Sequence, residues 1–225
     1  MTVYLLPEEP FFPPVDEAEP DGLVAIGGDL SAERLLQAYA QGIFPWFREA
    51  EDVFWYSPDP RMVMFPDKFK IHSSLKRIIK SNKFIVKFDT VFEQVIRGCA
   101  SAPRPGQDGT WISQDFIEAY IALHKRGFAH SIEVFYQENL VGGLYGVSLG
   151  AAFFGESMYF TMNNASKVAF HALVEHCRQN EFLFIDCQIE TAHLMHLGAS
   201  LIDRKEYLAL LQKAMKKETT PGPWK

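Results

Sequence analysis

From residue 62 almost to the C-terminus, helix and strand patterns alternate, and this feature restricts the possible folds most. Segments with apolar residues at helical spacing are separated by short runs with the character of strands. Three consecutive strand patterns, joined by short turns at the centre, favour antiparallel pairing. We therefore expect a mixed α/β domain of the α+β class with a largely antiparallel central sheet. The expected strands are 63–65, 84–88, 129–136, 140–147, 150–159, 182–187 and 199–202. Helices are expected at 73–81, 114–126 and 165–178. Three further helices are expected: one that Thr90 and Glu93 open as a capping box, one that ends at Gly198, and one that Asp203 and Glu206 cap.

The first sixty residues have a different character, because they are dense in turn-forming residues, with five prolines before residue 21. They predict a small, irregular N-terminal domain (1–62) ahead of the larger domain (63–225). Ser31 follows a glycine pair and is expected to cap a helix of about ten residues whose apolar face includes Tyr39. The glycines are interpreted as a helix entry, since the phosphate-loop pattern GxxxxGK[ST] is absent. At the other end, Pro221-Gly222-Pro223 predicts a frayed tail.

Composition excludes several classes of protein. The sequence contains no run of eighteen apolar residues, so it predicts no transmembrane helix. Its acidic start lacks the basic and apolar regions of a signal peptide, so a cytoplasmic protein is expected. Three cysteines without CxxC spacing argue against a disulfide framework or a zinc site. Cys187 is a poor candidate nucleophile, because no His stands out as its partner. We expect neither a metal nor a cofactor.

Two segments combine strand character with polar residues that a plain core would avoid: Gly155-Glu156-Ser157-Met158 and Ile185-Asp186-Cys187-Gln188. On a strand, residues two apart share a face, so Asp186 and Gln188 can point the same way. An acid that follows an apolar run is expected at a strand end, where α/β sheets often place their sites. The alternative, that Asp186 and Gln188 only cap the next helix, stays open on composition alone.

Longer segments resemble one family. They are GLVAIGGDLSAERLLQAYAQGIFPWF (22–47), WYSPDPRMV (55–63), TWIS (110–113), AYIALHKRGFAHSIEV (119–134), LVGGLYGVSLGAAFFGESM (140–158), ASK (165–167), IDCQ (185–188) and HLMHLGA (193–199). Together they cover most of the chain and resemble the leucyl/phenylalanyl-tRNA-protein transferase family. The resemblance implies that the larger domain is acetyltransferase-like (GNAT-like). It also implies that Gln188, Asp186 and Glu156 are the catalytic residues.

The implied reaction moves leucine or phenylalanine, with methionine as a further candidate donor, from aminoacyl-tRNA to the N-terminus of proteins that begin with Arg or Lys. Such proteins would then be marked for N-degron proteolysis. An aminoacyl ester is already activated, so positioning can supply much of the catalysis. Gln188 could accept a hydrogen bond from the attacking amine while Asp186 orients its amide, but Glu156 or the terminal ribose could take the proton instead. The acidic pair Asp186 and Glu156 would favour a cationic acceptor.

The resemblance also suggests where the substrates bind. The donor side-chain pocket is expected to contain Met158, Ile185, Leu144, Phe170 and Leu173, all of which could equally be ordinary core. Trp46, Trp111 and Tyr120 could stack on the terminal adenosine. The net charge is −6, yet residues 61–87 hold eight basic residues and one acidic residue. From this basic stretch, Arg61, Lys76, Arg77, Lys80 and Lys83 are expected to contact tRNA phosphates.

The chain departs from the family pattern after ESM, where it has Tyr159, Phe160 and Thr161. A bulky Phe160 is expected to narrow the donor pocket, which leaves the preference between leucine and phenylalanine open. Two other functions compete with the transferase. An acyl-CoA-dependent N-acetyltransferase lacks support, because the Gly-rich turn that would hold pyrophosphate is missing. A non-enzymatic RNA-binding module would leave Glu156, Asp186 and Gln188 without a role.

Overall fold

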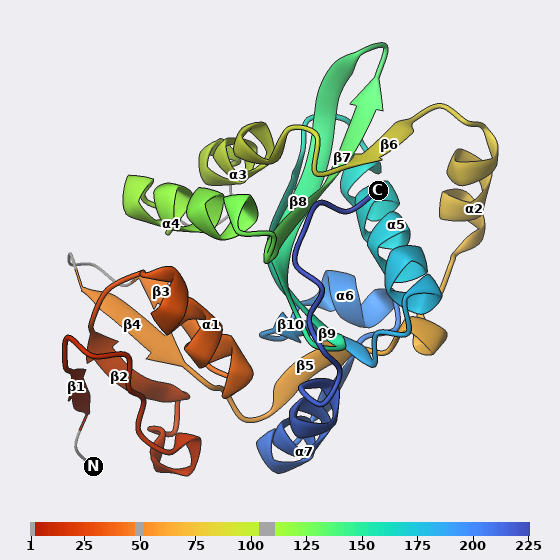
Figure 1. Ribbon diagram of the computed structural model, residues 1–225. Coiled ribbons are helices and arrows are strands. Elements are labelled where there is room, and N and C mark those ends of the chain that lie inside the picture. Colours follow the sequence, from red (N-terminus) through yellow and green to blue (C-terminus); the bar gives the residue numbers. More distant parts are fainter. Residues whose placement is uncertain (1–2, 48–51, 104–110) are drawn as a thin grey trace.

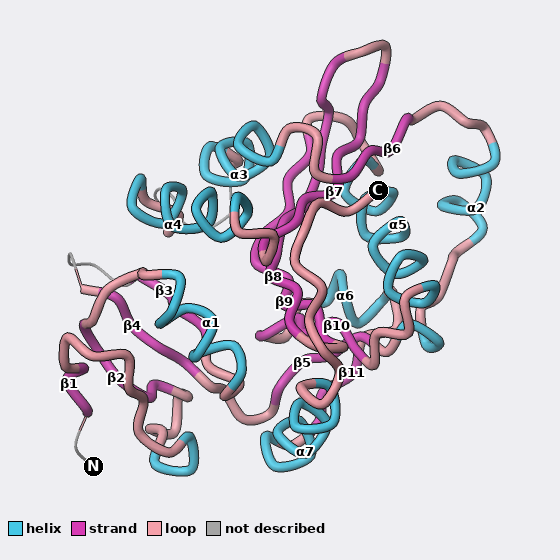
Figure 2. The backbone as a smooth tube through the Cα atoms, viewed as in Figure 1, coloured by secondary structure: helices cyan, strands magenta, loops and turns pink. Residues whose placement is uncertain are grey.

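Two β-sheets organise the computed structural model, which describes residues 3–47, 52–103 and 111–225 (Figures 1 and 2). The smaller sheet has the strand order β1-β2-β4-β3, and helix α1 (Ala32–Ala40) packs beside β3. As predicted, Ser31 caps α1, and its hydroxyl accepts a hydrogen bond from the backbone N–H of Arg34 at 3.3 Å. The strands themselves were not predicted, because each is short and turn formers surround it. They are β1 (Tyr4–Leu6), β2 (Leu23–Gly27), β3 (Phe44–Phe47) and β4 (Val53–Tyr56), with the 3-10 helix η1 (Val15–Glu17) between the first two.

The larger sheet has seven strands in the order β11-β5-β10-β9-β8-β7-β6 within the described residues. Every neighbouring pair is antiparallel except β9 with β10, which are parallel. The predicted α+β class with a largely antiparallel central sheet is therefore confirmed, whereas the domain boundary at residue 62 stays a prediction. The strands are β5 (Arg61–Met64), β6 (Ile85–Phe88), β7 (Ala129–Tyr136), β8 (Asn139–Leu149), β9 (Ala152–Phe160), β10 (Phe184–Gln188) and β11 (Ser200–Ile202).

Helices cover both faces of the larger sheet, as Figure 1 shows. On one face α3 and α4 pack against β7 and β8, and on the other face α5 packs against the same strands with α2 outside it. The ring of Tyr207 brings α7 against Phe184 of β10. None of the helices in the described ranges is long and apolar enough to cross a membrane. Their bounds are α2 (Ser73–Lys80), α3 (Phe92–Ser101), α4 (Gln114–Lys125), α5 (Ala165–Gln179), α6 (Ala192–His196) and α7 (Arg204–Ala214); the 3-10 helix η2 (Pro66–Lys68) precedes α2.

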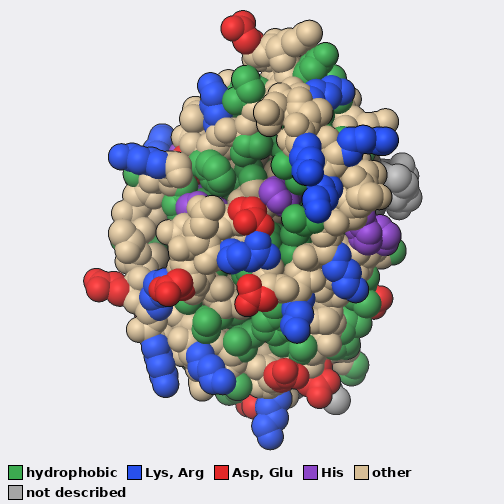
Figure 3. All heavy atoms as spheres, turned by 90° about the vertical axis from the view of Figure 1, so that its right-hand side faces the viewer, with side chains coloured by type: hydrophobic (Ala, Val, Ile, Leu, Met, Phe, Trp, Pro, Cys, Tyr) green, Lys and Arg blue, Asp and Glu red, His purple; other side chains and the backbone are tan. Residues whose placement is uncertain are grey.

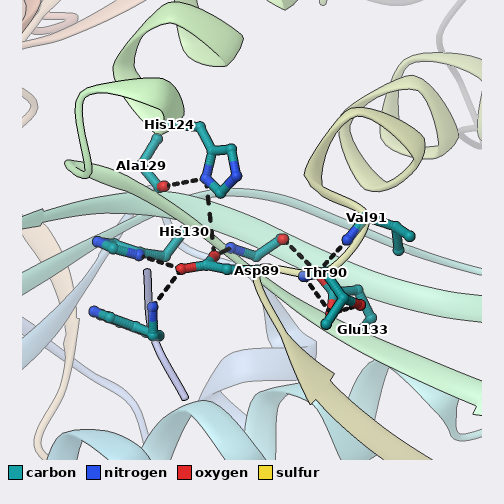
Figure 4. Close-up of polar contacts among 9 residues, drawn as sticks. Asp89, Thr90, Val91, His124, Ala129, His130 and Glu133 are labelled. Carbon is teal, nitrogen blue, oxygen red and sulfur yellow. Dashed lines mark hydrogen bonds and ion pairs between the residues drawn. The ribbon is translucent and has the colours of Figure 1, made fainter. Parts of the chain in front are cut away.

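The start of α3 differs from the prediction of a Thr90 and Glu93 capping box. The N-cap residue is Val91, and no side chain on the helix caps it. Instead, the Glu133 carboxylate from β7 accepts hydrogen bonds from the backbone N–H groups of Thr90 at 3.2 Å and Val91 at 3.4 Å (Figure 4). The buried carboxylate of a distant strand thus caps the N-terminus of α3, which the local pattern had predicted for Glu93.

The C-terminal tail is packed and not frayed. The Trp224 ring lies between the rings of His130 and His176, with centroids 4.2 and 4.0 Å away. The backbone N–H of Trp224 donates to the Asp89 carboxylate at 2.7 Å. The same carboxylate contacts His130 at 2.8 Å, as Figure 4 shows. The prediction of a frayed tail from Pro221-Gly222-Pro223 was wrong, because the aromatic residue directly after this segment packs against the rest of the protein.

Candidate active site

The two polar strand segments singled out in the sequence meet where strands β9 and β10 separate. Parallel pairing between these strands ends at Phe154 opposite Asp186. Beyond this pair β9 continues along β8 and β10 continues along β5, so a gap opens between them. Glu156 and Gln188 each lie two residues past the last pair and face each other across the gap.

Two β-bulges lie at this gap. The β8 and β9 register passes from Tyr145 opposite Ser157 to Gly146 opposite Gly155, which leaves Glu156 without a partner on β8. The β5 and β10 register shifts between Asp186 and Gln188. A bulge bends a strand and turns a side chain away from the regular alternation. The local distortions therefore direct Glu156 and Gln188 toward one another.

Glu156 is the centre of a buried hydrogen-bond network. Its Oε1 accepts from the hydroxyl of Tyr39 and from Nε2 of Gln188, both at 2.8 Å, and its Oε2 accepts from the hydroxyl of Tyr120 at 3.0 Å. Burial raises the pKa of Glu156 to about 7, although these three hydrogen bonds oppose the shift. Burial also raises the pKa of Tyr39 and Tyr120 well above the ordinary value, so both hydroxyls stay protonated donors.

Asp186 occupies a different environment from the one predicted. It is fully buried, and both carboxylate oxygens bind Arg61, at 2.9 Å from Nε and 2.7 Å from Nη2. Its other partners are the Tyr207 hydroxyl at 2.8 Å and the backbone N–H of Gln188 at 2.9 Å. Asp186 thus holds the backbone of Gln188, whereas Glu156 contacts the nitrogen of its side-chain amide.

A cavity of about 290 Å³ adjoins the gap, and its lining is mostly apolar. The five residues predicted for the donor side chain all line it: Leu144, Met158, Phe170, Leu173 and Ile185. The cavity is large enough for the side chain of an amino acid, and Glu156 and Gln188 lie on its wall. Phe44, Pro45, Ile189, Thr191 and Leu194 also line it, and none of these was singled out from the sequence.

The aromatic residues predicted to stack on adenosine separate into two groups. Trp46 and Trp111 line the cavity and are partly exposed, so both remain candidates. Tyr120 is fully buried between Phe116 and Tyr145, and its ring cannot reach a base. The stacking prediction for Tyr120 was therefore wrong, because its contribution to the site is the hydroxyl group that holds Glu156.

The residues predicted to bind phosphate also divide. Lys76, Arg77, Lys80 and Lys83 are exposed on or just after α2, and none of the four forms an ion pair with another described residue. Figure 3 shows Lys and Arg side chains on the face of the molecule that carries α2 and α5. Arg61 is only 1% exposed and is paired with Asp186. Its prediction as a phosphate contact was wrong, since the guanidinium is enclosed.

Two further expectations concerned residues near the pocket. Phe160 is 54% exposed at the end of β9 and is not part of the described cavity lining, so it does not narrow the pocket as expected. Burial raises the pKa of the Cys187 thiol, which disfavours the reactive thiolate and agrees with its rejection as a nucleophile.

Sequence reasoning missed Tyr39 and Tyr207 as parts of the site. Tyr39 was assigned to the apolar face of the helix after Ser31, and its spacing there carries no sign of a polar partner. Tyr207 lies 21 residues after Asp186, on a different element. Both contacts depend on the tertiary fold, so a single sequence contains no local signal for them.

Comparisons with known proteins identify the family of the chain. The family model described as leucyl/phenylalanyl-tRNA protein transferase matches residues 63–212, and the model of its N-terminal domain matches residues 28–59. A leucyl/phenylalanyl-tRNA–protein transferase of Thermodesulfovibrio yellowstonii is 53% identical over 100% of this chain and 91% of its own length. Another, from Myxococcus xanthus, is 50% identical over 100% of this chain and 97% of its own length.

Among solved structures, FemX is similar with a TM-score of 0.49 and 12% identity, covering 76% of this chain and 66% of its own. A ribosomal-protein-alanine N-acetyltransferase from Brucella melitensis has a TM-score of 0.37 and 13% identity, covering 48% of this chain and 81% of its own. The family matches and the full-length relatives are decisive. The chain belongs to the leucyl/phenylalanyl-tRNA–protein transferase family.

Proposed function

We propose that this chain transfers leucine or phenylalanine from aminoacyl-tRNA to the α-amino group of an acceptor protein. One observation carries the proposal: the hydrogen-bonded pair of Glu156 and Gln188 lies in the wall of a mostly apolar cavity of about 290 Å³. An aliphatic or aromatic side chain bound in the cavity would bring its ester carbonyl to that polar pair. Relatives about half identical over the whole chain bear the name of the same transferase.

The chemistry needs an amine to be held and to lose a proton. The amine nitrogen forms a bond with the ester carbonyl carbon, the bond from that carbon to the ribose oxygen breaks, and the proton from the amine ends on the released oxygen. Glu156 engages the amide nitrogen of Gln188, which leaves the carbonyl oxygen of Gln188 for the attacking amine. A carboxyl group whose burial raises its pKa to about 7 suits a proton acceptor at neutral pH, so Glu156 is the preferred candidate over the Gln188 amide.

The acceptors are proposed to begin with Arg or Lys. The charge of Asp186 is already neutralised by Arg61, so it does not attract a basic side chain as first expected. Glu156 is the remaining acidic residue among those that line the cavity, and it would supply the favourable charge. Proteins extended in this way would be marked for N-degron proteolysis.

The test is transfer of radiolabelled leucine or phenylalanine from charged tRNA to four peptides that differ only in their first residue: Arg, Lys, Asp or Ala. We expect product with the Arg and Lys peptides and little with the other two. Equal transfer to all four would contradict the proposed acceptor class, and no transfer to any of them would contradict the proposed reaction.

A further inference from the structure

Asp186 has no free hydrogen-bonding capacity with which to act on a substrate. Four donors converge on its carboxylate: Nε and Nη2 of Arg61, the hydroxyl of Tyr207 and the backbone N–H of Gln188, at distances from 2.7 to 2.9 Å. Asp186 and Arg61 are 0% and 1% exposed. An acceptor saturated in this way fixes geometry and does not take part in proton transfer.

Arg61 is itself held rigidly. Its guanidinium lies over the ring of Phe44 at 4.7 Å and over the ring of Tyr207 at 4.6 Å, and its planar fork meets both oxygens of Asp186. A planar, delocalised cation can stack and pair at the same time, whereas a lysine ammonium is a point charge that cannot reproduce both contacts. The pair therefore connects the small sheet, β5, β10 and α7 at one place.

The backbone of Gln188 needs such support. Its φ is +63°, in the left-handed region that non-glycine residues rarely adopt, and it lies just after the bulge in β10. The N–H that follows the bulge is held by Oδ1 of Asp186 at 2.9 Å. This conformation directs the Gln188 amide to Glu156, where Nε2 and Oε1 are 2.8 Å apart.

We propose that Arg61 is a positioning residue for aminoacyl transfer, which acts on the reaction through Asp186 and the backbone of Gln188. The reaction that Arg61 would position rests on the proposed function. The linkage from Arg61 through Asp186 to the backbone of Gln188 does not depend on it. It replaces the phosphate contact predicted for Arg61 with a role inside the site.

The first test compares Arg61→Lys with Arg34→Lys. Arg34 is a matched control, because it is equally buried, pairs with Asp29 at 3.1 Å and lies outside the cavity. We expect Arg61→Lys to lower kcat by about 10- to 100-fold, since a misplacement of about 1 Å can cost two orders of magnitude. KM for both substrates and the salt dependence of tRNA binding should stay close to wild type. A loss seen mainly in tRNA affinity, or an equal loss of kcat in Arg34→Lys, would overturn the proposal.

The second test is a double-mutant cycle with Gln188→Ala. If Arg61 acts through Gln188, adding Arg61→Lys to Gln188→Ala should lower kcat no further. Independent, multiplying losses would contradict the proposal. Should Arg61→Lys fail to fold, Tyr207→Phe removes one hydrogen bond to the same carboxylate and enters the same cycle.

A third test does not depend on catalytic activity. Hydrogen exchange of the Gln188 backbone amide should be faster in Arg61→Lys than in wild type and unchanged in Arg34→Lys, because the N–H loses a firmly held acceptor. Unchanged exchange in Arg61→Lys would refute the linkage even in a chain that transfers no amino acid. Absence of transfer by the wild type, with the exchange effect present, would instead refute the proposed function alone.

Discussion

Among single residues, Glu156 gives the reaction its expected dependence on pH. Burial raises its pKa to about 7, so the carboxylate forms as the pH rises through that value. The acceptor amine loses its proton in a nearby range, with an ordinary pKa of about 7.7–8.0. We predict that kcat/KM for the acceptor peptide rises with pH through two ionisations below about pH 8.

The control for this prediction is Glu156→Gln, which keeps the shape of the side chain and cannot ionise. The variant should be slower and should show one ionisation, that of the amine. A profile with two ionisations in Glu156→Gln would show that another group on the protein supplies the second one.

Met158 gives a prediction about the donor pocket, where it lines the cavity on β9. Met158→Ala should lower kcat/KM for leucine by about 10-fold and for phenylalanine by less, because losing pocket contacts costs on the order of 1–3 kcal/mol and the larger ring still fills the space. The matched control is Phe160→Ala on the same strand, which should leave the ratio of leucine to phenylalanine transfer unchanged. A shifted ratio in Phe160→Ala would restore the original expectation that Phe160 shapes the pocket.

At the scale of elements, α2 is the predicted site of phosphate binding. Changing Lys76, Arg77 and Lys80 to Glu should weaken tRNA binding. It should also make the slope of the logarithm of the binding constant against the logarithm of the salt concentration shallower by about 2, since each phosphate contact contributes about 0.7–0.9 to that slope. The control is the same change at three exposed lysines on or just after α7: Lys205, Lys213 and Lys216. Equal weakening in the two triple variants would indicate a general effect of net charge and no binding face on α2.

The docked C-terminal tail should contribute to stability in a way that depends on pH. Burial lowers the pKa of His176, which stacks on Trp224, so protonation of His176 favours the unfolded state. This contribution is present above the unfolded value of about 6.5 and is lost as the pH falls through the lower folded value. Trp224→Ala should lower Tm by several degrees at pH 8, where about 1 kcal/mol corresponds to about 2–4 °C, and by less at pH 5.5. Thermal unfolding at both pH values checks this, with the exposed Leu5→Ala as a control that should match wild type.

At the scale of the whole molecule, elements with strong periodicity were predictable and contacts between them were not. The strands at 129–136 and 150–159 and the helix at 165–178 lie within a few residues of β7, β9 and α5, because their patterns reflect one buried face. The strands of the small sheet escaped prediction, since they are only three to five residues long.

The site shows the same division. The polar residues Glu156 and Gln188 stand out in apolar strands, so the sequence alone could single them out. The residues that hold them could not be assigned correctly. Tyr120 was predicted to stack on adenosine, Arg61 to contact a tRNA phosphate, and Tyr39 to lie on an apolar helix face. Their roles depend on two sheets and three helices meeting at one point, which leaves no local pattern in the chain.

The measurement that tests the central claim most directly is the single-turnover rate of leucine transfer to an Arg peptide by wild type and Gln188→Ala, with tRNA binding measured in parallel. We predict rapid transfer by the wild type, a large loss of rate in the variant and unchanged tRNA affinity, because Gln188 lines the cavity and does not lie on α2. A variant that transfers leucine as fast as wild type would contradict the assignment of the gap between β9 and β10 as the active site.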